Sequence, residues 1–98
     1  MNREVIWSSA AENDLADILE YLNFKWNALT VSDFLDILDR NISYISSNPE
    51  QFPFYNRNEN IRKCVVTKHN TLYYSENFPD IVLLRLYDVR QKPSKLRF

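Results

Sequence analysis

The N-terminal half of the chain contains two stretches in which apolar residues recur every three or four positions. The first stripe consists of Leu15, Ile18, Leu19, Leu22 and Trp26. The second consists of Phe34, Leu38, Ile42 and Ile45. This spacing is typical of amphipathic helices that pack on a core through one face. We therefore predict a helix hairpin, with helices over residues 9–27 and 30–46.

Polar residues at the ends of these stretches indicate where the helices begin and end. Ser9 and Glu12 have the spacing of a capping box, so we expect the first helix to begin there. Thr30 is the predicted N-cap of the second helix. Asn48 and Pro49 end that helix, because the residue before a proline is biased away from the helical conformation.

From Ile61 onward the apolar pattern changes to a period of two, which is typical of strands. We predict strands over residues 61–67, 71–76 and 81–88, and a short first strand over residues 3–8. The later connections are short, which favours an antiparallel meander. The order β-α-α-β-β-β predicts an α+β fold, with an antiparallel sheet and the helix hairpin on one face. At 98 residues, the chain is predicted to form a single domain over residues 1–98.

Residues 49–60 are predicted to form a loop with three aromatic residues, Phe52, Phe54 and Tyr55. A loop of this length often carries function. The alternative is that the aromatic side chains close one end of the hydrophobic core.

Alternation along the last strand separates its residues into two faces. Val82, Leu84 and Leu86 are predicted to face the helices, which leaves Arg85 and Tyr87 on the other face. That face would gain Arg62 or Lys63 from the strand over residues 61–67, together with Arg90. Arginine suits an anion because its planar fork contacts two oxygens at once. A simpler interpretation is that Arg85 pairs with Asp88 or Glu76 at the sheet surface.

The charges are divided between the two parts of the chain. Residues 1–60 carry ten Asp/Glu and four Lys/Arg, a net charge of −6, and residues 61–98 carry three and eight, a net charge of +5. This asymmetry predicts a basic face that meets an acidic partner. The single cysteine, Cys64, allows no internal disulfide and favours a reducing, cytoplasmic setting.

Several classes of site are not indicated by the sequence. The chain has no glycine, which argues against a glycine-rich phosphate loop. The only histidine, His69, lies in a predicted turn, and no metal-ligand spacing is present. We therefore expect no cofactor and no metal. No signal peptide or membrane span is indicated either.

The whole pattern resembles the RelE/ParE superfamily of toxins from type II toxin–antitoxin systems. The opening "VIWSSAAENDLADILEYL" and the closing "IRKCVVTKHNTLYYSE" and "IVLLRLYDVRQKPSKL" carry the resemblance, together with "NP" and "FP" after the second helix. The resemblance implies a role in plasmid stabilisation and growth inhibition, neutralised by a cognate antitoxin. RelE-like members cleave mRNA on the ribosome, whereas ParE-like members inhibit DNA gyrase without acting as ribonucleases.

The resemblance carries both activities onto particular residues. A ribonuclease would use Arg62, Arg85, Tyr87 and Arg90. A target or antitoxin would be bound by a wider set, namely Arg62, Lys63, Tyr74, Arg85, Tyr87, Arg90 and Lys92. The sequence leaves a homodimer open.

Three departures favour the ParE-like branch over a ribosome-dependent mRNA endonuclease. The net charge is −1, whereas a protein that docks on ribosomal RNA is expected to be strongly basic. The second predicted helix carries Asp33, Asp36 and Asp39 on its polar face. No histidine stands near the C-terminus as a proton carrier, and Tyr87 is a poor substitute at neutral pH. We therefore predict a toxin that acts by protein binding, with gyrase as its target.

Overall fold

The protein is described by a computed structural model that covers residues 3–90 and 96–98. Within these residues, two α-helices, one short 3₁₀ helix and five strands follow one another. In order they are β1 (Val5–Trp7), α1 (Ser9–Lys25), α2 (Ala28–Ser47), η1 (Pro49–Gln51), β2 (Phe54–Asn56), β3 (Ile61–Thr67), β4 (Asn70–Asn77) and β5 (Asp80–Asp88).

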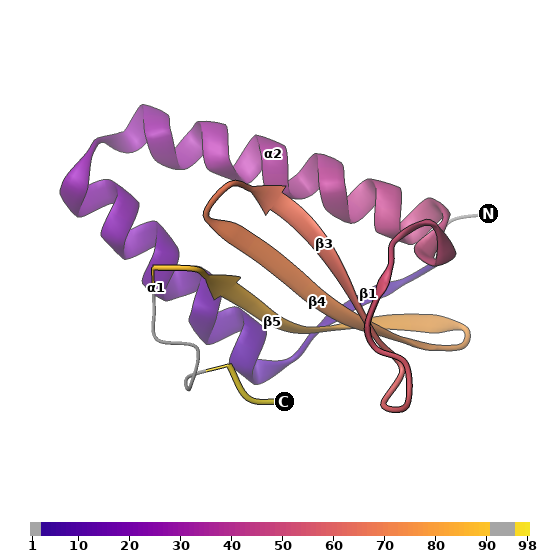
Figure 1. Cartoon of the computed structure of the whole chain (residues 1–98). Helices are drawn as coiled ribbons and strands as arrows, with labels where there is room; N and C mark the ends of the chain where they lie inside the picture. Colours follow the sequence, from indigo (N-terminus) through magenta and orange to yellow (C-terminus); the bar gives the residue numbers. More distant parts are fainter. Residues whose placement is uncertain (1–2, 91–95) are drawn as a thin grey trace.

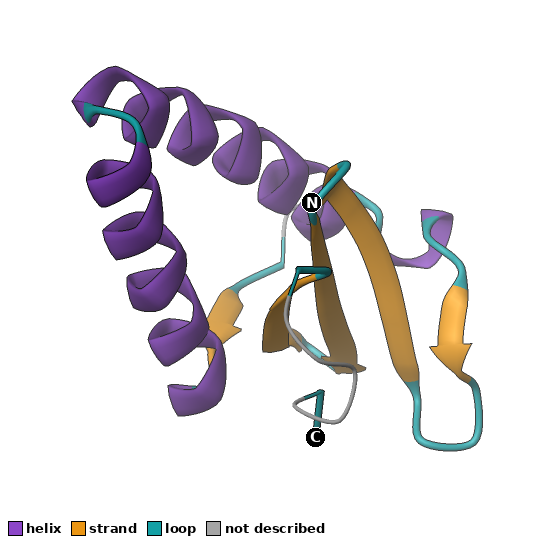
Figure 2. Cartoon of the chain, turned by 60° about the vertical axis from the view of Figure 1, so that its left-hand side comes forward, coloured by secondary structure: helices purple, strands orange, loops and turns teal. Residues whose placement is uncertain are grey.

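The strands form one sheet in the order β1-β5-β4-β3-β2, and both helices lie on the same side of it (Figures 1 and 2). The β3–β4–β5 meander is antiparallel, as predicted, and β1 runs parallel to β5. The α+β prediction is confirmed. The sequence did not indicate β2, which lies inside the predicted 49–60 loop and pairs with the start of β3.

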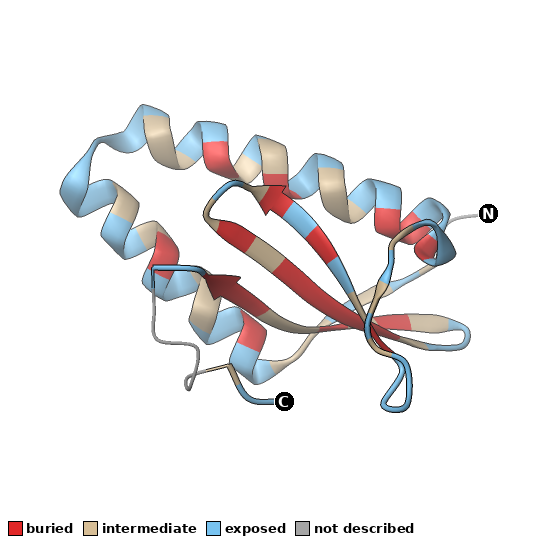
Figure 3. Cartoon of the chain, viewed as in Figure 1, coloured by how far each residue is buried: buried red, intermediate tan, exposed pale blue. Residues whose placement is uncertain are grey.

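The main hydrophobic core fills the space between the helices and the sheet (Figure 3). Both predicted helical stripes contribute to it, through Ile18 of α1 and through Phe34, Leu38 and Ile45 of α2. Trp26 is an exception. It follows the last residue of α1 and is 64% exposed, so its predicted place in the stripe is wrong.

The N-cap of each helix lies before the residue that was predicted to cap it. Ser8, rather than Ser9, caps α1, and its Oγ accepts a hydrogen bond from the Ala11 amide at 3.0 Å. The same hydroxyl donates to the Leu84 carbonyl oxygen at 2.9 Å, so the cap also joins α1 to β5. Asn27 caps α2 and accepts from the Thr30 amide at 2.9 Å, which places Thr30 inside the helix.

A β-bulge in β5 changes which residues face the helices. Tyr73 pairs with Arg85 but Tyr74 pairs with Leu83, so Leu84 is an extra residue in β5. Ile81, Leu83 and Leu86 lie in the main core, whereas Leu84 packs on the opposite face beside Tyr87. Val82, Leu84 and Leu86 were all predicted to face the helices. This prediction is wrong for Val82 and Leu84 and correct for Leu86, which follows the bulge.

Candidate functional site

Arg85 is held by a carboxylate from α1. Its Nε and Nη2 donate to the two carboxylate oxygens of Asp14 at 2.7 and 2.9 Å. The two side chains are only 14% and 13% exposed, and this hydrogen bonding raises the pKa of Arg85 against the opposing effect of burial. Arg85 does have an acidic partner, but that partner is neither Asp88 nor Glu76.

Asp14 also completes the edge of β5. β1 pairs with β5 only as far as Leu83. Beyond that point the Leu86 amide donates to Asp14 Oδ2 at 2.9 Å. The carboxylate thus replaces a neighbouring strand at a position where the backbone would otherwise lack an acceptor.

Arg90 is held at the end of β5 by Asp88 and Tyr21. Its Nε donates to Asp88 Oδ1 at 2.9 Å, Nη2 binds Oδ2, and the guanidinium lies 4.7 Å from the centre of the Tyr21 ring. Burial would raise the pKa of Asp88, but the hydrogen bonds from Arg90 outweigh it and lower that pKa. These residues line a cavity of about 210 Å³ with Asp17 and Ile18.

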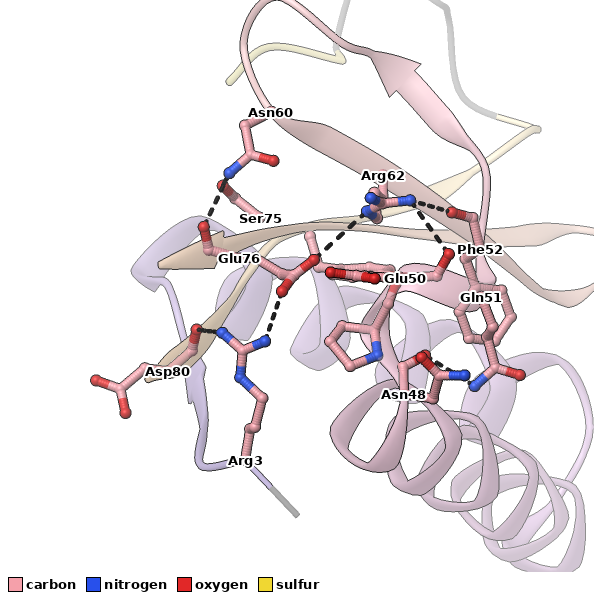
Figure 4. Close-up of polar contacts among 12 residues, drawn as sticks. Arg3, Asn48, Glu50, Gln51, Phe52, Asn60, Arg62, Ser75, Glu76 and Asp80 are labelled. Atoms are coloured by element: carbon pink, nitrogen blue, oxygen red, sulfur yellow. Dashed lines mark hydrogen bonds and ion pairs between the residues drawn. The ribbon is translucent and has the colours of Figure 1, made fainter. Parts of the chain in front are cut away.

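Arg62 lies beside the segment that follows α2 (Figure 4). Its Nη1 donates to the Phe52 carbonyl oxygen at 2.7 Å, and its Nε lies 3.7 Å from Glu76 Oε1. The guanidinium also stacks on the Phe54 ring, with its carbon 3.9 Å from the ring centre. These contacts hold η1 and β2 against β3 and β4, so Arg62 has a structural role at this position.

The other predicted site residues lie in different surroundings. Tyr74 is fully buried on the helix side, where its hydroxyl donates to the Pro49 carbonyl oxygen, so its predicted place on a binding surface is wrong. Tyr87 is 8% exposed and packs in a small cluster on the opposite face. Lys63 is exposed near the sheet edge. Lys92 lies outside the described residues.

The sheet face opposite the helices is partly covered by the C-terminal residues. Leu96 packs against the cluster of Ile61, Tyr73 and Tyr87. The Phe98 ring lies 5.3 Å from the Tyr73 ring and 5.6 Å from the Tyr55 ring, centre to centre. Arg85 Nη1 donates to the Arg97 carbonyl oxygen at 2.8 Å. The predicted open basic face is therefore an aromatic surface with the end of the chain across it.

The tip of the helix hairpin presents an apolar surface that the sequence pattern did not predict. Phe24, Trp26 and Leu29 are 87%, 64% and 68% exposed. Beside the tip, a groove of about 430 Å³ runs between the helices and the β3–β4 turn, and its lining includes Leu22, Trp26, Phe34, Ile37, Lys68 and His69. Three large exposed apolar side chains in six positions indicate a contact surface. In the sequence, these three residues could have been recognised as exposed because they do not fall on one face of a helix.

Within residues 3–90 and 96–98, no three His, Cys, Asp or Glu side chains are grouped so that they could hold a metal ion. In the same part of the chain, neither helix has the length and apolar composition that a membrane crossing requires.

Comparisons with known proteins identify the family. The family model described as "ParE toxin of type II toxin-antitoxin system, parDE" matches residues 5–93. A solved chain from "Chromosomal ParDE TA system from P. aeruginosa" is similar with a TM-score of 0.76 and 12% identity, over 89% of this chain and 96% of that chain. A comparison with curated protein sequences found no match. At 12% identity the structural likeness shows the fold alone. The family model spans most of the chain, and the chain therefore belongs to the ParE toxin family of type II toxin–antitoxin systems.

Proposed function

We propose that this toxin acts by binding a protein, that DNA gyrase is its target in the cytoplasm, and that a cognate antitoxin neutralises it. The observation that carries this proposal is the state of the three arginines expected in a ribonuclease site. Arg62, Arg85 and Arg90 each donate to a carboxylate or carbonyl oxygen of the same chain. A ribonuclease needs such guanidinium groups to stabilise charge on a phosphate.

The proposed protein partners would use the apolar surface at the hairpin tip and the groove beside it. Exposed aromatic side chains are typical anchors in protein interfaces, since they bury a large area at a low cost in conformational entropy. We expect the antitoxin to lie along the groove and over the sheet face near Arg85 and Arg90. Lys63 and Lys92 remain proposed contacts for acidic side chains.

The antitoxin part of the proposal is tested by co-expression with the product of the adjacent gene. We expect the two proteins to co-purify as a stable complex, and growth inhibition on induction of the toxin alone to be relieved by that product. Two proteins that separate on a sizing column would contradict the proposal.

The gyrase part is tested with purified components. We expect the toxin to inhibit supercoiling of relaxed plasmid by gyrase, and prior incubation with the antitoxin to restore supercoiling. Unchanged supercoiling at a large molar excess of toxin would remove gyrase as the target. Mapping of mRNA 5′ ends after induction tests the ribonuclease alternative, which new cleavage inside coding sequences would favour.

A further inference from the structure

Part of the outer edge of β3 has no neighbouring strand. β2 pairs with β3 only at Arg62 and Ile61, and it runs beside the part of β3 that follows the β2–β3 turn (Figure 2). The Lys63 amide donates to the Pro53 carbonyl oxygen at 3.0 Å, just before β2 begins. Beyond Lys63, no described strand pairs with this edge of β3.

The backbone N–H and C=O groups of Val65 point outward from this edge. The Lys63 amide bonds toward β2, so Lys63 and its β4 partner Tyr73 form a non-hydrogen-bonded pair. Hydrogen-bonded and non-hydrogen-bonded pairs alternate in an antiparallel ladder. Val65 and its partner Thr71 therefore form the next non-hydrogen-bonded pair, which directs the Val65 N–H and C=O away from β4. No other described backbone group bonds to them, and Val65 is 65% exposed.

The backbone groups at the outer edges of β5 and β3 differ in whether a side chain bonds to them. On β5, Asp14 accepts a hydrogen bond from the Leu86 amide, beyond the end of β1. On β3, no described side chain bonds to the Val65 backbone, and the nearby side chains are lysines. Lysines on an edge strand discourage pairing between identical copies, yet they favour an acidic strand from another protein.

The charge around this edge has a single sign. Residues 61–75 contain Arg62, Lys63 and Lys68 and no Asp or Glu. Lys63 and Lys68 are both exposed. Two copies joined along β3 would bring the lysines of both together, whereas a segment with Asp or Glu would find opposite charges on both sides of Val65.

We propose that the edge of β3 from Lys63 to Thr67 takes up an extended acidic segment of the antitoxin as an additional strand. The Val65 N–H and C=O pair with the backbone of that segment. An apolar side chain of the segment packs on Val65, and acidic side chains lie beside Lys63 and Lys68. This inference rests on the proposed antitoxin partner, and it adds where and in which conformation part of that partner binds.

Amide hydrogen exchange, followed by NMR, tests the proposal without altering the chain. In the free toxin we expect the Val65 amide to exchange rapidly, and the amide of Cys64, which pairs with Leu72 of β4, to exchange slowly. In the complex with the antitoxin from the adjacent gene, protection of the Val65 amide should rise by at least about 100-fold. A stable complex in which Val65 stays unprotected overturns this inference and leaves the proposed function standing. Failure to form any complex overturns both.

A pair of variants tests the same contact by affinity. Val65→Pro removes an N–H that no group of the described chain accepts, whereas Val65→Thr keeps the N–H and a β-branched side chain. We expect Val65→Pro to weaken antitoxin binding by about tenfold or more, and Val65→Thr by less than about threefold. Equal affinities of two folded variants would overturn the inference. A free toxin that dimerises, and that Val65→Pro makes monomeric, would instead assign the edge to a second copy. If Val65→Pro does not fold, hydrogen exchange decides.

Discussion

Asp14 serves two donors that lie more than 70 positions later in the sequence. Its carboxylate binds the Arg85 guanidinium and the Leu86 amide, and both side chains of the ion pair are largely removed from solvent. A partly buried guanidinium costs free energy unless a carboxylate compensates for its lost hydration. At the scale of single residues, Asp14 therefore fixes α1 against the bulged part of β5.

Replacement of Asp14 by asparagine should strongly destabilise the fold. The new carboxamide would still offer an oxygen to the Leu86 amide, but it would leave the Arg85 charge without its carboxylate. We expect Asp14→Asn to lower the free energy of unfolding by about 3 kcal/mol, measured by urea denaturation. Asp17→Asn, on an exposed position of the same helix, is the control and should change it by less than about 0.5 kcal/mol. Similar losses in both variants would contradict this role of Asp14.

Cys64 should be chemically inert while the protein is folded. The side chain is 1% exposed, and burial raises the pKa of its thiol to about 11. The thiolate is the reactive form, so little of it is present at about pH 8, close to the ordinary thiol pKa. We expect no reaction with Ellman's reagent in the native protein and one equivalent after unfolding in guanidinium. Rapid labelling of the native protein would show that Cys64 is more accessible than its packing indicates.

The sequence could predict which face of a strand an apolar residue occupies, but not where an extra residue interrupts the alternation of faces. Alternation placed Tyr87 on the face away from the helices, and the structure agrees. It failed for Val82 and Leu84, because the extra residue in β5 shifts the alternation by one position. Nothing in "IVLLRLYD" marks that residue. The partner of Arg85 was missed because Asp14 lies more than 70 positions earlier in the sequence, so no local pattern relates the two residues.

At the scale of whole elements, the period of the apolar residues was sufficient for both long helices and for the three strands of the meander. Both helix caps precede the predicted residues, and Asn27 rather than Thr30 caps α2. Ser8 rather than Ser9 caps α1, since Ser8 also bonds to β5. β2 has only three residues, too few for a period to appear, and it is held by the stacking of Arg57 and Arg62 on Phe54.

The hairpin tip should contribute to partner binding and very little to stability. Phe24 and Leu29 are among the most exposed apolar side chains of the described chain. We expect Phe24→Ser and Leu29→Ser to change the free energy of unfolding by less than about 0.5 kcal/mol. Each should weaken antitoxin binding by at least about tenfold if the tip is an anchor. Isothermal titration calorimetry measures the affinity.

A matched surface variant and a core variant separate these two effects. Phe78 is 88% exposed in the β4–β5 turn, at the opposite end of the molecule from the tip (Figure 1). Phe78→Ser should therefore bind the antitoxin normally. Leu38→Ala removes a fully buried side chain and should cost about 2–5 kcal/mol. Unchanged affinity in both tip variants would exclude the tip from the interface.

At the scale of the whole molecule, the order of elements along the chain predicted the fold class, and the resemblance of several sequence segments indicated the toxin superfamily. The sequence could not predict how the two charged parts of the chain meet. Asp14 comes from the acidic part and Arg85 from the basic part. The two parallel hydrogen bonds of the Arg85 guanidinium therefore go to a carboxylate of the same chain. The sequence also could not predict that Leu96 and Phe98 return to the sheet, since two apolar residues show no period.

The return of the C-terminal residues to the sheet should contribute measurably to stability. Phe98 contacts the rings of Tyr55 and Tyr73 in tilted and edge-on arrangements, although 52% of the residue is exposed. Such aromatic pairs contribute about 1 kcal/mol beyond the area they bury. We therefore expect Phe98→Ala to lower the free energy of unfolding by about 1 kcal/mol, measured by urea denaturation. Phe24→Ala removes the same side chain from a position that is 87% exposed, and it should have almost no effect. Equal values for the two variants would mean that Phe98 does not stabilise the sheet face, and that the aromatic surface of Tyr55 and Tyr73 is open to a partner in solution.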